Sequence, residues 1–235
     1  MKVAAVLGVG PGLGAAIAWR FAGEGFAVAL MARREESVAA VREEIEAVGG
    51  EARAIFTEAT DPDSVAASFE RVRNELGDPE VFVYNAGAFQ MGGVLEVSPA
   101  KFDECFRANC AGAFYAAHEV LPAMVEAGHG TILLTGASAA LRGKARFSAL
   151  AVGKFGLRAL AQSMAREFGP QGIHVSHVII DGQINTPRIG EMMPGREEHT
   201  LLSPDAIAET YWQLHSQDRT AWTLESDLRP SVESF

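Results

Sequence analysis

The 235-residue sequence has little positive charge, few cysteines and no long apolar run. Its formal net charge of −10 argues against a nucleic-acid partner, because such partners select a basic surface. No apolar stretch reaches the roughly 18 residues that a membrane span needs, so we expect no membrane segment. Cys105 and Cys110 are the only cysteines, and no second cluster completes a four-ligand metal site. Two thiols of this kind are typical of a reduced, cytoplasmic chain.

Two further absences narrow the class of protein. The first residues combine one lysine with an apolar run, but the glycines from Gly8 onward end that run early and no small-residue cleavage site follows. A buried first strand explains this segment better than a signal peptide does. The sequence also lacks the Gly-x-Ser-x-Gly elbow of the α/β-hydrolases.

Short apolar runs alternate with longer helical patterns along the whole chain, and apolar residues make up 48% of it. This alternation predicts a doubly wound, three-layer α/β fold of the Rossmann type, with a seven-stranded parallel sheet, in a single domain spanning residues 1–235. The predicted strands are Lys2–Gly8, Phe26–Ala32, Ala52–Phe56, Val81–Tyr84, Thr131–Thr135, His174–Ile180 and Trp222–Leu228. The predicted helices are Gly12–Glu24, Glu35–Val48, Pro62–Leu76, Pro99–Ala127, Ser148–Phe168 and Pro204–His215.

The segment 183–202 shows neither the alternating pattern of a strand nor the 3.6-residue period of a helix. It contains two prolines, two methionines, two glycines and scattered charges. A loop of this length in a compact domain is usually functional, and this one follows the sixth predicted strand, beside the edge of the sheet where ligands bind. The sequence therefore predicts a mobile substrate lid.

A glycine-rich turn follows the first predicted strand and leads directly into a helix. Glycines permit positive φ angles and let the backbone approach a phosphate group, and the helix N-terminus offers free N–H groups and the positive end of its dipole. Between a strand and a helix, such a turn predicts a binding site for the pyrophosphate of a dinucleotide. The residues of the turn expected to bind are Gly8, Gly10, Gly12, Leu13 and Gly14.

Five further motifs follow the turn at fixed places along the predicted strands and helices. They are Asn85-Ala86-Gly87, Asn109, Ser138, Lys154 and the segment from Asp181-Gly182 to Thr186. Together with the spacing Gly8-x3-Gly12-x-Gly14, they resemble the short-chain dehydrogenase/reductase family over almost the whole chain.

The resemblance implies a role for each motif. Ser138, Lys154 and Asn109 stand where the family has catalytic residues, the asparagine also kinking its helix. Further residues that would hold the cofactor are Asn85, Ala86, Gly87, Lys154, Gly182, Ile184 and Thr186. The family also implies a small-molecule substrate and a homodimer or homotetramer. The helix pattern near Leu157–Phe168 is apolar on more than one side, which fits either a subunit contact or a thick core.

The end of the second predicted strand indicates which dinucleotide is preferred. An NAD-selective site usually has an acidic residue there, which bonds the ribose 2′-hydroxyl, but Ala32 occupies this place and Arg33 and Arg34 follow. A guanidinium pairs well with a 2′-phosphate, and arginine here marks NADP preference in the family. We expect NADP(H), with NAD(H) as the alternative and Glu58 near the adenine. The competing interpretation is that the two arginines simply begin an exposed helix.

The sequence departs from the family at the proton donor. The family depends on Tyr-x3-Lys, in which the tyrosine exchanges a proton with the substrate oxygen. Four residues before Lys154 stands Leu150, and the related Tyr-x6-Lys spacing leads to Phe147. The chain is therefore predicted to be a divergent member without the catalytic tyrosine.

Two hypotheses follow from the missing tyrosine. In the first, the protein is an NADP(H)-dependent oxidoreductase with an atypical site for a small carbonyl, an alcohol or an activated alkene. Ser138 would bond the substrate oxygen, and water or another side chain would supply the proton, with Ser148, Tyr211 and His199 as candidates. Proton delivery contributes about 10²–10⁴-fold in rate, so its loss weakens reduction without forbidding it. In the second, the protein is an NADP(H)-binding sensor or assembly subunit without turnover.

Overall fold

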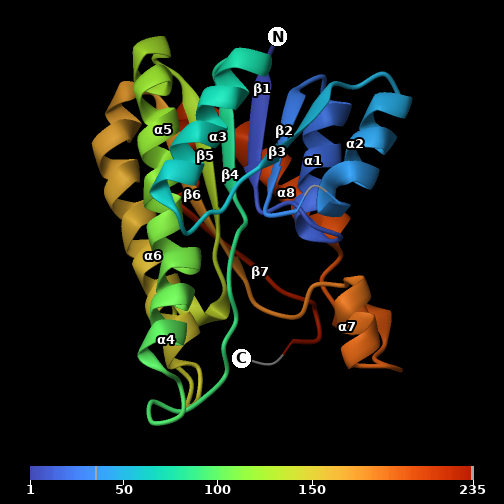
Figure 1. Cartoon of the computed structure of the whole chain (residues 1–235), viewed down its shortest axis with the longest axis vertical. Helices are drawn as coiled ribbons and strands as arrows, with labels where there is room; N and C mark the ends of the chain where they lie inside the picture. The colour runs from blue at the N-terminus through green and yellow to red at the C-terminus, as the bar shows by residue number, and fades with distance from the viewer. Residues whose placement is uncertain (35, 234–235) are drawn as a thin grey trace.

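Seven strands form one parallel sheet in the order β3-β2-β1-β4-β5-β6-β7 in the computed structural model, which describes residues 1–34 and 36–233 (Figure 1). The strands are β1 (Val3–Leu7), β2 (Ala27–Ala32), β3 (Ala52–Phe56), β4 (Val81–Tyr84), β5 (Gly130–Thr135), β6 (Ile173–Ile180) and β7 (Glu225–Leu228). Every neighbouring pair is parallel, which confirms the predicted doubly wound sheet. Glu35, the first residue of the predicted second helix, lies outside the described residues.

Helices cover both faces of the sheet. The α-helices are α1 (Leu13–Gly23), α2 (Glu36–Ala47), α3 (Pro62–Glu75), α4 (Pro99–Phe106), α5 (Gly112–Ala127), α6 (Ser148–Phe168), α7 (Pro187–Met192) and α8 (Pro204–His215). One core cluster joins α1, α2 and α8 to one face, and a second joins α3, α5 and α6 to the other. Figure 1 shows both layers, with α4 and α7 beyond the carboxyl edge of the sheet.

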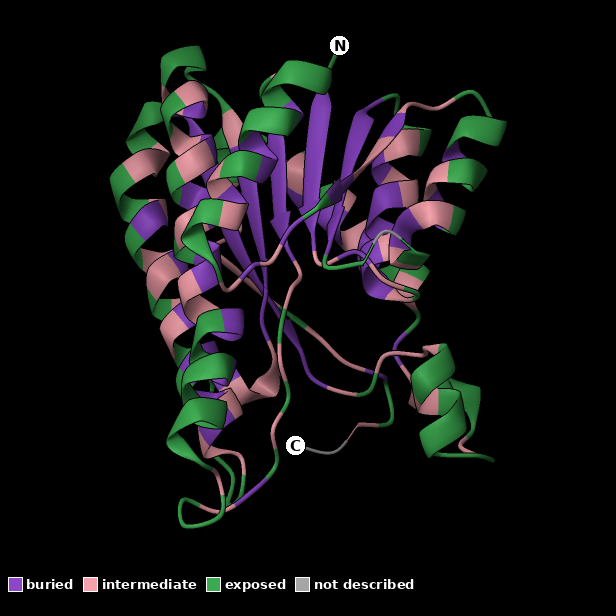
Figure 2. Cartoon of the chain, in the orientation of Figure 1, coloured by how far each residue is buried: buried purple, intermediate pink, exposed green. Residues whose placement is uncertain are grey.

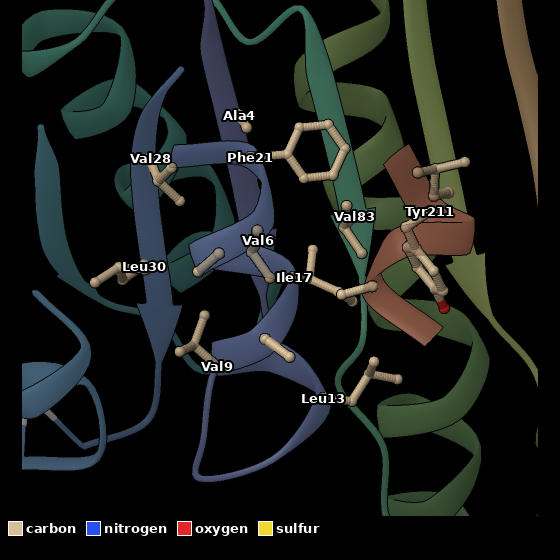
Figure 3. Close-up of a cluster of buried hydrophobic side chains, with 14 of the residues drawn as sticks. Ala4, Val6, Val9, Leu13, Ile17, Phe21, Val28, Leu30, Val83 and Tyr211 are labelled. Carbon is tan, nitrogen blue, oxygen red and sulfur yellow. The ribbon is translucent and has the colours of Figure 1, made fainter. Parts of the chain in front are cut away.

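The central strands are apolar along their whole length because both of their faces are covered. β1 reads VAAVL and β2 reads AVALMA, and every residue of both is buried (Figure 2). Ile17 and Phe21 of α1 pack against this sheet beside Tyr211 of α8 (Figure 3). Burial on both faces holds the strand ends rigidly, so the loops at the carboxyl edge project from a fixed base.

The predicted helix Pro99–Ala127 is helical throughout, and it changes to a π-helical turn around Asn109, where the family resemblance implies a kink. A π-helical turn, Arg107–Ala111, separates α4 from α5. Within it, the Asn109 side chain donates 2.9 Å to the Cys105 carbonyl, and the Tyr84 hydroxyl donates 2.8 Å to the Ala108 carbonyl. These side chains take acceptors that the regular helix would use, which is a common cause of such turns.

The last strand is shorter than predicted. β7 begins at Glu225 instead of Trp222, since Trp222 ends a short 3₁₀ turn, Arg219–Ala221, and its ring stacks on His174 with centroids 4.9 Å apart. The other six strands agree with the sequence prediction to within about one residue at each end.

The segment 183–202, predicted as an irregular loop, contains a short helix. Two backbone hydrogen bonds join the ends of this segment. The Leu202 N–H donates to the Gln183 carbonyl, and the Asn185 N–H donates to the Leu202 carbonyl, each over 2.8 Å. Between these points α7 follows Thr186, whose hydroxyl caps the Ile189 N–H at 3.3 Å. We call this segment the lid. The described residues contain no helix that is both long and apolar enough to span a membrane.

Candidate functional site

A cavity of about 650 Å³ opens at the carboxyl edge of the sheet. It lies at the ends of β1 and its neighbours β2 and β4. From β1 the strands β2 and β3 follow one another on one side, and β4 to β7 follow on the other side, so the strand order reverses at β1. In open α/β sheets ligands bind at this reversal of strand order. The predicted cofactor residues that line the cavity are Gly8, Gly10, Arg33, Arg34, Glu58, Asn85, Ala86 and Gly87.

The glycine-rich turn is packed so closely at Gly8, Gly12 and Gly14 that a side chain is excluded at each of them. Gly8 has φ +103°, and a Cβ placed on it would lie 2.4 Å from the Ala86 nitrogen. A Cβ on Gly14 would lie 2.5 Å from the Gly8 carbonyl oxygen, and the Asn85 side chain donates 2.9 Å to that same oxygen. Gly12 precedes α1, whose N-terminus has no side-chain cap. The turn therefore presents backbone to the cavity, as a pyrophosphate site requires.

The end of the cavity beside the C-terminus of β2 carries positive charge. Arg33 and Arg34 are exposed and line it directly after β2. Within the described part of the chain, neither guanidinium is paired with a carboxylate. Glu58 is held by its own loop, since its carboxylate accepts from the Thr60 N–H at 3.1 Å and hydroxyl at 2.8 Å. The two arginines are therefore free to pair with an anionic ligand.

A second group of predicted residues gathers around Gly87. A Cβ placed on Gly87 would lie 3.0 Å from Asn109 Oδ1 and 3.9 Å from Lys154 Nζ. Asn109 also donates 2.7 Å to the Ala88 carbonyl, which fixes the strand end after β4. Lys154 is only 7% exposed and donates 2.7 Å to the Thr135 carbonyl at the end of β5. Burial lowers the pKa of Lys154 to about 8.

The remaining predicted residues lie after β5, on α6 and after β6. Ser138 begins a single 3₁₀ turn after β5 and is half-buried. Leu150 is also half-buried and lies one helical turn before Lys154 on α6, so the two side chains share a face. Gly182 and Ile184 follow β6, and the Thr186 methyl carbon lies 2.7 Å from a Cβ placed on Gly12. The base of the lid thus reaches the glycine-rich turn.

The tyrosines of the chain serve the core. Tyr84 and Tyr211 are fully buried, and burial raises the pKa of both hydroxyls. Tyr211 exchanges a 2.8 Å hydrogen bond with the Thr135 hydroxyl inside the core, which argues against the predicted role as proton donor. Tyr115 packs against the α3–α5 side of the sheet. His199, the other candidate in this region, is exposed and lies 3.3 Å from Glu197.

Asp181 follows β6 directly and precedes Gly182. It is 5% exposed, and its carboxylate lies 3.6 Å from the Arg142 guanidinium and 3.3 Å from that of Arg229. Arg142 comes from the loop before α6, and Arg229 follows β7. The buried carboxylate therefore ties these two segments together beside the base of the lid.

Two residues at the site were missed by sequence reasoning. His177 is fully buried on β6, its imidazole presses on Gly136, and neither ring nitrogen has a partner among the described residues. Burial lowers its pKa to about 4, so the ring is neutral at pH 7. Arg188, on α7, lines the same cavity as Arg33 and Arg34. Its place in an irregular segment gave no sequence signal. Among the described residues, no cluster of His, Cys, Asp or Glu could hold a metal ion.

Comparisons with known proteins agree with the fold. A family model described as short chain dehydrogenase matches residues 2–196. A short-chain dehydrogenase/reductase of Armillaria gallica is 36% identical over 189 residues, which cover 79% of this chain and 72% of that protein. The crystal structure of a short-chain dehydrogenase from Rhodopseudomonas palustris is 39% identical, with a TM-score of 0.85, and the match covers 97% of this chain and 98% of that one. A metagenomic short-chain oxidoreductase in complex with NADP is 29% identical, with a TM-score of 0.84 and coverage of 99% and 98%.

Proposed function

The chain belongs to the short-chain dehydrogenase/reductase family, and from this membership we propose that it is an NADP(H)-dependent oxidoreductase with an atypical active site. One observation carries the proposal of the cofactor. The dinucleotide cavity ends in the guanidiniums of Arg33 and Arg34, which pair with no carboxylate of the described residues, and Ala32 stands where an NAD-selective site would have a carboxylate. The solved complex of a related oxidoreductase with NADP supports the same choice.

The residues present fit an NADP(H) molecule along its length. Gly8, Gly12 and Gly14 leave no room for a Cβ in the turn where the pyrophosphate would lie, and Arg33 and Arg34 would take the 2′-phosphate. Lys154 uses one of its three N–H groups on the Thr135 carbonyl, which leaves two for the hydroxyls of the nicotinamide ribose. When bound, the reduced cofactor supplies a hydride.

The side chains near Lys154 can orient a substrate but offer few protons. Asn109 fixes the Ala88 carbonyl and Gly87, and so shapes the floor of the site. We propose that Ser138 donates a hydrogen bond to the substrate oxygen and that water supplies the proton. Leu150 has no proton to give at the place where the family has its acid.

We propose that the preferred substrate is an activated alkene, with carbonyl compounds as slower substrates. Hydride addition to a conjugated C=C bond leaves an anion delocalised onto the carbonyl oxygen, so the step needs less help from an acid than reduction of an isolated carbonyl. The surroundings suit such a substrate. The Phe89 and Phe147 rings lie 5.8 Å apart across the loops beside the site, and the Phe89 ring is exposed.

A matched pair of substrates tests this function. With NADPH, we expect a conjugated enone to be reduced faster than the saturated ketone of the same skeleton by about 10²-fold, because only the ketone lacks a delocalised product anion. The measurement is consumption of NADPH together with identification of the reduced product. Equal rates, or a faster ketone, would contradict the proposed substrate class. Tight NADPH binding without consumption by any acceptor would contradict turnover itself.

The pH dependence of this reaction follows from Lys154. Its pKa of about 8 means that the ammonium predominates below pH 8 and is lost above it. Since the ammonium holds the ribose and stabilises the developing oxyanion, we expect kcat/KM to fall about tenfold per pH unit above pH 8. A profile from pH 6 to pH 10 measures this. Lys154→Arg keeps its charge throughout this range, so any activity that it retains should lack the descending limb. If kcat/KM of the wild-type protein stays constant up to pH 10, the proposed role of the Lys154 ammonium in the reaction is wrong.

We also propose a cytoplasmic homodimer or homotetramer in which residues 1–235 form one domain. Phe106, Phe114, Val152 and Phe155 leave large apolar side chains exposed on and beside α4, α5 and α6. An apolar surface of this kind is typical of a subunit contact. The molecular mass in solution tests the assembly, and a monomer at micromolar concentration would contradict it.

A further inference from the structure

We propose that Arg188 on the lid helix α7 binds the pyrophosphate of the dinucleotide and thereby holds the lid closed. This inference rests on the proposed function, because it requires the cavity to take a dinucleotide. It adds a cofactor-binding residue at a place where the family resemblance assigned only Gly182, Ile184 and Thr186.

Arg188 is far from the other cavity cations in the sequence but shares their cavity. It lines the space together with Gly10 and Pro11 of the glycine-rich turn. Within residues 1–34 and 36–233, no carboxylate pairs with its guanidinium. The other arginine of the lid, Arg196, is held by hydrogen bonds within the lid. Its guanidinium donates to the Thr200 hydroxyl at 3.0 Å and to the Thr200 carbonyl at 3.3 Å. Arg188 is therefore the lid cation that is free to take a phosphate.

The start of α7 indicates which phosphate Arg188 reaches. Thr186 precedes α7 and touches the turn at Gly12, where its methyl carbon lies 2.7 Å from a Cβ placed on that glycine. Gly12 is the N-cap of α1, the end of the helix toward which a pyrophosphate is drawn. Arg33 and Arg34 follow β2 and are left for the 2′-phosphate. We therefore assign Arg188 to the pyrophosphate.

The packing of the lid explains why it would need this contact. None of the residues of α7 is buried, and Met192 is 63% exposed. The lid is pinned at its base by the backbone bonds between Gln183, Asn185 and Leu202, whereas Met192 and Met193 at the end of α7 are exposed. A guanidinium–phosphate pair is a strong, charge-assisted contact, and here it would supply the attraction that side-chain packing does not. Occupancy of the dinucleotide site would then set the position of the lid.

Calorimetric titration with NADPH and with NADH tests the assignment. Because both nucleotides carry the pyrophosphate, we expect Arg188→Gln to weaken both by about tenfold or more. Arg33→Gln should weaken NADPH alone. Arg166→Gln is the control for loss of one positive charge, since Arg166 is exposed near the C-terminal end of α6 and, within the described part of the chain, donates to the Gln162 carbonyl and pairs with no carboxylate. It should change neither affinity.

Each outcome bears on a different claim. Wild-type affinities in Arg188→Gln would overturn the role of Arg188 while leaving NADPH binding intact. A loss for NADPH alone would place Arg188 at the 2′-phosphate and overturn the pyrophosphate assignment. If the unaltered protein binds neither nucleotide, the proposed function fails first.

Proteolysis of the lid gives a second measurement that does not depend on turnover. A glutamyl endopeptidase cleaves after glutamate, and Glu191 and Glu197 are exposed on the lid. We expect saturating NADPH to slow cleavage in the unaltered protein and in Arg166→Gln, because the lid closes. In Arg188→Gln, saturating NADPH should give little protection. Equal protection of both variants would contradict a closing role for Arg188.

Discussion

Leu150→Tyr is expected to raise the rate of carbonyl reduction by about 10²–10⁴-fold, the contribution of a positioned proton donor. Leu150 lies one turn before Lys154 on the same face of α6 and is half-buried, so a phenol there would lie beside the ammonium. A neighbouring positive charge lowers the pKa of a tyrosine from its usual value of about 10, which makes the proton easier to transfer. The measurement is kcat/KM for a saturated ketone with NADPH.

Leu150→Phe is the matched control, because it adds the ring without the hydroxyl. If the gain comes from proton transfer, the phenylalanine variant should reduce the ketone no faster than the native protein. Equal gains in both variants would assign the effect to ring packing. No gain in either would show that Lys154, Asn109 and Ser138 do not form a competent site.

The combined change Arg33→Gln and Arg34→Gln is expected to weaken NADPH binding by about 10²-fold or more while leaving NADH binding nearly unchanged. Hydrogen bonds to charged groups are each worth about 1.5–3 kcal/mol, and both guanidiniums line the cavity directly after β2. Both side chains are exposed, so the change should leave the free energy of unfolding almost unaltered. Dissociation constants for the two nucleotides measure the effect.

A parallel loss for NADH would show that the arginines attract the dinucleotide only through general charge. In that case the 2′-phosphate would not be their partner, and the preference for NADP(H) would have to come from elsewhere in the cavity. Unchanged affinity for both nucleotides would show that Arg33 and Arg34 do not contact the bound dinucleotide.

The sheet could be predicted from sequence because its signals are local. Strands buried on both faces must be short, continuous apolar runs, as in Val3–Leu7 and Ala27–Ala32, and glycines must stand where the backbone approaches the next strand end. Gly8 illustrates this, because its positive φ and its closeness to Ala86 each exclude a side chain. The same local signals located the cavity.

The features that sequence reasoning missed depend on contacts between distant segments. The kink at Asn109 was expected, but its π-helical form comes with a hydrogen bond from the Tyr84 hydroxyl, which arrives from β4. Tyr211 carries the right chemistry for a proton donor, but the packing of α8 directs its hydroxyl to Thr135 in the core. Arg188 lines the cavity in a lid whose base is held by hydrogen bonds between Gln183 and Leu202. These contacts join residues 19 positions apart, and the sequence of the segment has no periodicity that would predict them.

The account depends on a dinucleotide lying along the glycine-rich turn with its extra phosphate at the end of β2. Calorimetric titration of the unaltered protein with NADPH and NADH tests this most directly. We expect both nucleotides to bind with one molecule per chain, and NADPH to bind at least about tenfold more tightly, because only NADPH gives Arg33 and Arg34 a phosphate to pair with. Absence of heat with both nucleotides, or tighter binding of NADH, would contradict the account.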